Sequence, residues 1–240
     1  MITVEHLGRL LHHVEYWFAE SEDIDKILNT SKNFDSCVIK GLDKPIFTNS
    51  EYYYGTSAIN DLELDKDTMF QQFSKNTKYE IKRSERECED TDFIRVKVNS
   101  FEDIQVYWKD MQIIYESMYK SKGITHPFPE RQIKDFINNH VLYFCAALYK
   151  GEIKIYHLYV VGNREVQLQF SFSDYRNSDE SSMKQFIGRL NKRMHFEDML
   201  YFKKLGIYRY NWGGISHVDK SLKGIDEFKL SFGGGGLSIV

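Results

Sequence analysis

One lysine near the end of the chain is of a type that can assist group transfer. Lys229 stands between Phe228 and Leu230, and the pattern predicts a strand that ends in the glycine run 233–236. A lysine in a cleft can hold a phosphate or stabilise a developing oxyanion as a point charge. Spacing alone favours the simpler alternative, an exposed strand lysine, because most lysines are solvated.

Three polar residues are spaced for a single face of one helix. Asn191, His195 and Asp198 stand at positions i, i+4 and i+7, so their side chains are expected to stack along the helix. A carboxylate that orients a histidine fixes its tautomer, which would let His195 accept a proton. The alternative of equal weight is a half-buried histidine with a surface acid three residues later.

Two further segments are candidates for substrate contact. Trp212-Gly213-Gly214 predicts a close approach of the backbone to a ligand or to a packed neighbour, because glycine has no side chain to block it. His126 lies in a proline-containing loop and could touch an acceptor, although a turn or capping role is favoured. The predicted substrate-binding residues are therefore Asn191, Trp212, Gly213, Gly214, Phe228 and His126.

Composition excludes several classes of protein. The 240 residues are 42% hydrophobic and 15% aromatic, which argues for a sizeable core and against disorder. The net charge of −3 and the pI near 6.3 give no overall attraction for nucleic acid, and no DNA partner is expected. Three unclustered cysteines and eight histidines show no metal-ligand spacing, so no metal is predicted. No signal peptide or membrane span is evident, and a cytoplasmic protein is expected.

Hydrophobic periodicity predicts an alternation of helices and strands. Residues 1–35 have near-helical spacing, and 141–173 reads as a meander of three strands with turns at 150–152 and 162–164. In the third of these strands Val166, Leu168, Phe170 and Phe172 are expected to share one face. The remaining predicted strands are 37–40, 46–48, 52–54, 93–98 and one ending at 214. Further helices are predicted to begin at Asp67 or Thr68, to cover 102–120, to include 133–137 and to cover 179–205.

This order of elements predicts an α/β (α+β) protein with a mixed, largely antiparallel sheet flanked by helices. Residues 1–65 are expected to form an N-terminal extension packed on a domain that covers 66–240. The chain contains no G-x-S-x-G, Walker or dinucleotide-binding motif, so hydrolase, kinase and dehydrogenase functions have no support.

The helix-rich start, meander, loop, helix and strand resemble the GNAT acyltransferase core, and a GNAT-like fold is implied. In that family a glycine-rich loop presents backbone N–H groups to the pyrophosphate of CoA at a helix N-terminus. The matching loop here is 176–182, which implies Arg176, Ser178, Ser181 and Ser182 as cofactor-binding residues. Arg176 fits the family pattern, whereas Asp179 replaces its first glycine.

The C-terminal motifs resemble more closely the Fem-type branch of the GNAT superfamily. They are Gly188-Arg189-x-Asn191, His195-x-x-Asp198-Met199, Tyr210-x-Trp212-Gly213-Gly214-Ile215 and Phe228-Lys229-x-x-Phe232-Gly233-Gly234. The resemblance implies that Lys229 neutralises charge on the donor or on the tetrahedral intermediate. His195, paired with Asp198, would then accept the proton of the attacking amine.

The resemblance implies an N-acyltransferase that moves an acyl group from an activated donor, with acyl-CoA favoured, to an amine. The expected acceptor is an aminosugar nucleotide or another precursor in cell-envelope or polysaccharide biosynthesis. A Fem-like aminoacyltransferase that uses aminoacyl-tRNA is the first alternative, and it is disfavoured by the acidic pI. The second alternative is an inactive GNAT-like module that binds a ligand or a partner.

Overall fold

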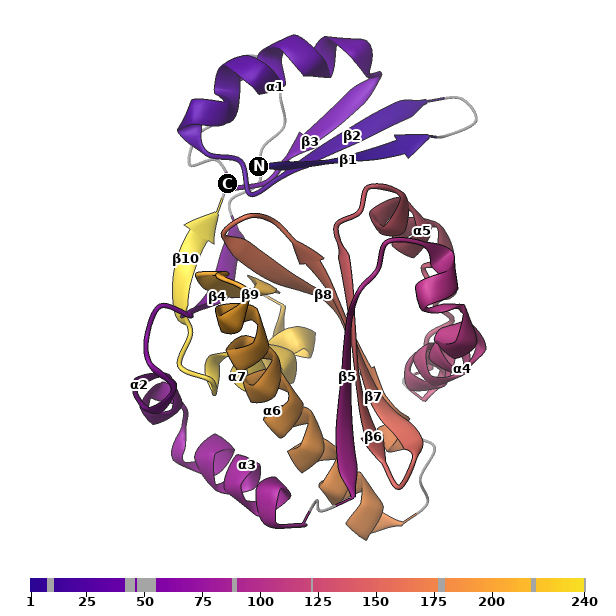
Figure 1. Ribbon diagram of the computed structural model, residues 1–240, viewed down its shortest axis with the longest axis vertical. Helices are drawn as coiled ribbons and strands as arrows, with labels where there is room; N and C mark the ends of the chain where they lie inside the picture. Colours follow the sequence, from indigo (N-terminus) through magenta and orange to yellow (C-terminus); the bar gives the residue numbers. More distant parts are fainter. Residues whose placement is uncertain are drawn as a thin grey trace.

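The computed structural model describes residues 1–7, 11–41, 46, 55–87, 90–121, 123–176, 180–216 and 219–239. It contains two sheets, one of three strands and one of seven (Figure 1). The larger sheet has the order β10-β4-β9-β8-β7-β6-β5, and all its pairs are antiparallel except β8 with β9. The predicted mixed, largely antiparallel sheet is therefore confirmed. Its strands are β4 (Gly55–Asp61), β5 (Thr91–Lys97), β6 (Leu142–Tyr149), β7 (Glu152–Val161), β8 (Glu165–Ser173), β9 (Arg209–Ile215) and β10 (Gly235–Ile239).

Helices cover both faces of the larger sheet (Figure 1). One face packs against α2 (Lys66–Gln72), α3 (Lys75–Glu87) and α6 (Ser181–Lys204). The other packs against α4 (Gln105–Lys120) and α5 (Glu130–Asn138). Periodicity predicted α4, α5 and α6 correctly. The helix predicted to open near residue 67 is two helices, because Phe73 adopts an extended ψ of 149° at the end of α2.

The meander is confirmed, but the predicted common face of its third strand is wrong. The register shifts between Leu158 and Tyr159, which pair with Phe170 and Leu168 respectively. Gln169 is the extra residue of a β-bulge, and a bulge reverses the faces of the residues that follow it. Leu168 consequently joins the core under α6, whereas Phe170 joins the core under α4.

The prediction of helix over residues 1–35 is wrong for most of that span. The chain forms the strands β1 (Ile2–Leu7) and β2 (His12–Trp17) and the helix α1 (Ile24–Thr30). Two short 3₁₀ helices, η1 (Ser21–Asp23) and η2 (Ser31–Asn33), flank α1. The strand predicted at 37–40 is confirmed as β3 (Ser36–Ile39), which pairs in parallel with β2. Val14 and Tyr16 alternate toward a small core with Ala19 and Ile27, and this tertiary burial selects strand over helix. The strands predicted at 46–48 and 52–54 lie outside the described residues, apart from Ile46.

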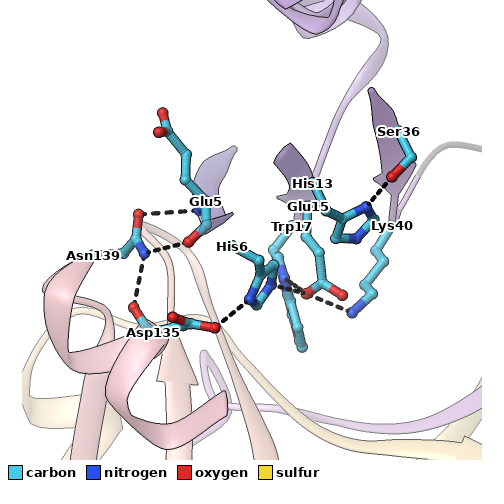
Figure 2. A network of polar contacts seen from close by, with 9 residues as sticks. All are labelled: Glu5, His6, His13, Glu15, Trp17, Ser36, Lys40, Asp135 and Asn139. Carbon is cyan, nitrogen blue, oxygen red and sulfur yellow. Dashed lines mark hydrogen bonds and ion pairs between the residues drawn. The ribbon is translucent and has the colours of Figure 1, made fainter. Parts of the chain in front are cut away.

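The small sheet contacts α5 of the main body through polar groups (Figure 2). His6 Nδ1 lies 2.7 Å from Asp135 Oδ2, and the Asn139 amide exchanges hydrogen bonds of 3.3 and 3.4 Å with the backbone of Glu5. Trp17 adds an edge-on ring contact with Phe136 at 5.8 Å. The division at residue 65 stays a prediction; β4, which precedes that point, pairs with β9 and β10 of the larger sheet.

Glu15 is the centre of the polar network on β2 (Figure 2). Its carboxylate accepts hydrogen bonds from Trp17 Nε1 at 2.7 Å and from Lys40 Nζ at 3.1 Å, and Lys40 also lies 3.5 Å from the centroid of the Trp17 ring. Burial opposes the charge of Glu15, but Lys40 and Trp17 outweigh it and lower the pKa of the carboxyl group.

Candidate functional site

The parallel strands β8 and β9 pair over only a short stretch. The described pairs are Glu165 with Arg209, Val166 with Tyr210, and Gln167 with Asn211. Gly213 follows with a φ of +78°, a left-handed conformation that favours glycine. Its N–H donates to Asn211 Oδ1 at 2.7 Å, which holds the bend in place. The two strands therefore diverge at the Trp212-Gly213-Gly214 segment. The left-handed backbone conformation of Gly213 explains why a glycine stands at that position.

A cleft of about 490 Å³ lies at the C-terminal end of β8, beyond the point where its described pairing with β9 stops. It is bordered by α3, by the N-terminal half of α6, by the end of β8 with η4 (Asp174–Arg176), and by α7 (Lys223–Leu230). The lining residues are Tyr79, Glu80, Arg83, Ser173, Tyr175, Lys184, Gln185, Ile187, Gly188, Arg189, Asn191, Lys192 and Phe228. Two of the predicted substrate-binding residues, Asn191 and Phe228, are among them.

The cleft is basic, but most of its cations are paired with acids. Glu87 contacts both Arg83 Nε, at 2.6 Å, and Arg189 Nη2, at 2.8 Å. Glu80 forms an ion pair with Lys192. These pairs hold the guanidinium and ammonium groups in fixed positions around a space that suits a ligand with phosphate groups.

Behind the cleft lies a buried polar network centred on Asp198, which is fully shielded from solvent. Arg95 Nε donates to Asp198 Oδ1 at 2.8 Å, and His157 Nδ1 and the Tyr159 hydroxyl lie 2.9 and 2.8 Å from Asp198 Oδ2. His157 Nε2 is 2.9 Å from Asn191 Oδ1. Asn191 and Asp198 are thus brought together, as their spacing predicted, but through a histidine from β7.

The hydrogen bonds around His195 define the position of its proton. An ionised Asp198 only accepts, so the Tyr159 hydroxyl proton is directed to it. The Tyr159 oxygen then accepts from Tyr210 at 2.9 Å, and the Tyr210 oxygen accepts from His195 Nδ1 at 2.8 Å. His195 therefore carries its proton on Nδ1, while its buried Nε2 has no hydrogen-bond partner among the described residues and presents a lone pair.

Burial changes the titration of this network. It lowers the pKa of His195 well below the ordinary value, and the neighbouring His157, stacked on it at 4.0 Å, acts in the same direction. Burial also raises the pKa of the hydroxyls of Tyr159 and Tyr210 well above the usual range. His195 is consequently a neutral imidazole that contacts Phe228, a residue of the cleft wall, at 5.6 Å between ring centroids.

Comparison with known proteins bears on the fold. No family model matches the chain, and no curated protein matches it. FemX superposes with a TM-score of 0.64 at 11% identity, over 94% of this chain and 78% of FemX. The fold is that of FemX. L-PGS from Bacillus licheniformis gives a TM-score of 0.58 at 13% identity, over 99% of this chain and 79% of its own.

A third solved structure extends the comparison. It is the C-terminal domain (DUF2156) of a protein from Agrobacterium fabrum assigned as a lysylphosphatidylglycerol synthetase. Its TM-score is 0.57 at 12% identity, over 99% of this chain and 78% of the domain. These likenesses confirm the predicted GNAT-like fold of the Fem type.

In this FemX-like fold Lys229 lies on α7, so the prediction of a strand at this position is wrong. Asp226 and Phe228 turn inward from this helix while Glu227 stays exposed. A strand would show the same alternation, so this short sequence pattern did not distinguish a helix from a strand. Lys229 Nζ donates to the carbonyl oxygen of Gly214 at 2.6 Å. Burial lowers the pKa of Lys229, and the carboxylate of Asp226 opposes that shift. Lys229 therefore lies at the diverging end of β9.

Trp212 is buried and helps to position His195 rather than line the cleft. Its ring lies 4.5 Å from the His195 ring and 4.6 Å from Phe232, and its Nε1 donates to Asn60 Oδ1 at 2.7 Å. Gly233, of the Phe-Gly-Gly motif, packs so closely that an added Cβ would lie 2.4 Å from the Gln72 carbonyl oxygen. Close packing against Gln72 therefore explains why this position of the Fem-type motif is a glycine.

The other predicted site residues lie elsewhere. Arg176, Ser181 and Ser182 are exposed at the two ends of the loop before α6, and Ser178 lies outside the described residues. Their role in binding a cofactor stays a prediction. His126 belongs to the opposite face of the sheet, where its ring stacks on Tyr119 at 4.5 Å.

Sequence reasoning missed His157, Tyr159 and Arg95, and it named Tyr210 only as part of a family motif; these four residues complete the buried network. A signal was present in β7: His157 and Tyr159 stand two residues apart in the mainly apolar stretch 155–161, so they share a face. Within the described part of the chain, no helix combines the length and apolarity that a bilayer span requires. No cluster of three His, Cys, Asp or Glu side chains suited to a metal ion is found in that part either.

Proposed function

We propose that this protein is an acyltransferase that moves an acyl group from a phosphate-bearing donor to an amine. The observation that carries the proposal is the divergence of β8 and β9 beside a basic cleft, with Lys229 at the diverging end. The acyl arm of the donor would enter between the two strands, and its phosphates would lie in the cleft and at the N-terminus of α6, near Arg176, Ser178, Ser181 and Ser182.

The reaction follows from the chemistry of the residues around that point. The amine attacks the acyl carbonyl carbon, and the carbonyl oxygen becomes an oxyanion that the Lys229 ammonium stabilises. The amine proton passes to His195 Nε2, directly or through water, because Nδ1 already carries a proton. The tetrahedral intermediate then expels the donor group. Alignment of donor and amine supplies much of the remaining rate enhancement.

Acyl-CoA is the donor that we favour, because a cleft of about 490 Å³ accommodates a nucleotide-sized group. The acceptor that we propose is the amine of an aminosugar nucleotide or of another cytoplasmic precursor of the cell envelope. A second candidate function is aminoacyl transfer from tRNA. The similarity in fold to FemX, to L-PGS and to a domain named as part of a lysylphosphatidylglycerol synthetase favours it.

Native mass spectrometry followed by turnover assays tests these proposals. The protein is incubated separately with acetyl-CoA and with aminoacyl-tRNA, and any donor that binds is then tested with a panel of aminosugar nucleotides and envelope precursors. Lys229→Ala is expected to lower kcat by about 100- to 1000-fold, the usual effect of removing one oxyanion-stabilising group. Lys223→Ala, an exposed lysine on the same helix, is the matched control.

The outcomes separate the alternatives. Wild-type turnover by Lys229→Ala would contradict the role of this lysine. A complex with aminoacyl-tRNA and none with acetyl-CoA would favour the second candidate function. Binding of a donor without transfer to any amine would support the inactive, ligand-binding module.

A further inference from the structure

A second basic concavity lies at the opposite end of α6 from the cleft. It has a volume of about 560 Å³ and is bordered by the C-terminal half of α6, by β5 and by α2. We call it the β5–α6 groove, and it is lined by Lys66, Arg95, Glu197, Leu200, Tyr201, Lys203 and Lys204. The cleft uses residues 184–192 of the same helix, so the two sites share none of their described lining residues.

The groove carries an excess of positive charge. Four of its lining side chains are cationic, and Glu197 is the one acid among them. Lys66 and Lys204 are exposed, and no ion pair joins either of them to a residue that the structure describes. Lys203 Nζ instead donates to the carbonyl oxygens of Leu62 and Glu63 at 2.6 and 3.1 Å, which fixes its ammonium group at the rim.

Two arginines at this end of the sheet have nitrogens without hydrogen-bond partners in the part of the chain that the structure describes. Arg95 uses Nε to bind Asp198, while its Nη2 is buried and unpartnered. Arg193, one turn of α6 before Glu197, has an unpartnered Nε and Nη1. Both guanidinium groups lie over the ring of Phe93, at 5.1 and 5.3 Å from its centroid. Buried N–H groups without acceptors are costly, and an anion with several oxygens is the ligand that would satisfy them.

We propose that the β5–α6 groove binds the phosphate groups of a small phosphorylated molecule, a diphosphate ester. Arginine forks and lysine ammonium groups together are the usual protein partners of phosphate oxygens. The volume suits a ligand of nucleotide size, and Tyr201 and Leu200 provide an apolar wall for its organic part. The proposal does not depend on acyl transfer, because binding here is measured without donor or acceptor.

The first test is titration calorimetry of the full chain with inorganic pyrophosphate at constant ionic strength. Charge reversal at two exposed positions, Lys66→Glu with Lys204→Glu, is expected to weaken binding about tenfold or more. Lys109→Glu, which reverses an exposed lysine of α4 on the other face of the sheet, is the matched control and is expected to leave the affinity unchanged. Lys184→Glu, in the cleft, reports any pyrophosphate that binds there instead. Thermal unfolding of each variant verifies that the fold is retained.

Several results would overturn the proposal. They are the absence of pyrophosphate binding by the wild type, an unchanged affinity in the Lys66→Glu, Lys204→Glu variant, and a loss of binding confined to Lys184→Glu. A second readout is the side-chain Nε–H resonance of Arg193, assigned with Arg193→Lys. It is expected to shift on addition of pyrophosphate, and an unmoved resonance would remove Arg193 from the site.

Titrations with orthophosphate and adenosine diphosphate identify the ligand chemistry. Pyrophosphate is expected to bind more tightly than orthophosphate, because it reaches more of the cations. Adenosine diphosphate is expected to bind more tightly still, through contact with Tyr201 and Leu200. Equal affinities for adenosine diphosphate and pyrophosphate would overturn the ester and leave the free anion as the ligand.

Discussion

The cleft and the β5–α6 groove are built on the two halves of one helix and carry similar numbers of cations, yet their electrostatics differ. In the cleft Arg83 and Arg189 share Glu87, and Lys192 is paired with Glu80. In the groove two exposed lysines lack such acids among the described residues, and Arg95 keeps a nitrogen with no described partner. Arg193, which shares the Phe93 ring with Arg95, also has nitrogens with no described partner. Counting positive charges therefore does not distinguish the two regions, whereas the pairing of each cation does.

Asp198 joins the two regions through the interior. It binds Arg95 on the side of the groove, and through Tyr159 and Tyr210 it orients His195 behind the cleft. A single buried carboxylate thus fixes a guanidinium group in one region and a histidine tautomer in the other. Changes in this network, or in the pairing of the cleft cations, test how far the two regions are independent.

The largest effect is expected from Asp198→Ala. Removal of one partner from a buried ion pair leaves Arg95 uncompensated and is expected to lower the free energy of unfolding by about 3–5 kcal/mol. Urea denaturation measures this change. Glu197→Ala, a neighbouring and partly exposed acid on the same helix, is the control and is expected to have a much smaller effect. Equal losses in the two variants would contradict a central role for Asp198.

A smaller effect is expected from the titration of His195. The unfolded histidine gains a proton near its ordinary pKa of 6.5, whereas burial keeps the folded side chain neutral to a lower pH. Between the two pKa values the unfolded state binds more protons, so this residue destabilises the fold as the pH falls below 6.5. The slope is at most about 1.4 kcal/mol per pH unit.

Denaturation of the wild type and of His195→Gln at several pH values between about 5 and 8 measures that slope. The variant lacks the titrating group, so its stability is expected to fall less steeply on acidification. Identical slopes below pH 6.5 would show that His195 titrates normally in the folded state.

The smallest effect is expected from Glu87→Gln, which makes the cleft resemble the groove. The change leaves Arg83 and Arg189 without their acid, and an anionic donor is expected to bind a few-fold more tightly. Because the pair is partly exposed, stability should change by less than about 1 kcal/mol. The KM for the donor is the measurement, and pyrophosphate binding in the groove is the control that should stay constant.

Part of the candidate site was predictable from local spacing. The positions of Asn191, His195 and Asp198 on one helical face followed from the 3.6-residue period, and the structure places all three on α6 around His157. His157 itself was missed because its partners are 34 and 41 residues away in sequence. Lys229 was assigned to a strand because Phe228 and Phe232, the second of which precedes the glycine run, give little periodicity.

The sequence by itself determined the elements whose apolar residues repeat over many positions: the meander, α4, α5 and α6, and hence the mixed sheet with helices on both faces. A long repeat accumulates burial along one face, so its local pattern and its tertiary environment agree. The tertiary structure alone decided the strands near the N-terminus, the bulge at Gln169 and the helix of Lys229. It also decided which cations are paired, because the acids and bases that meet around α6 come from distant segments, and spacing along the chain carries no record of such contacts.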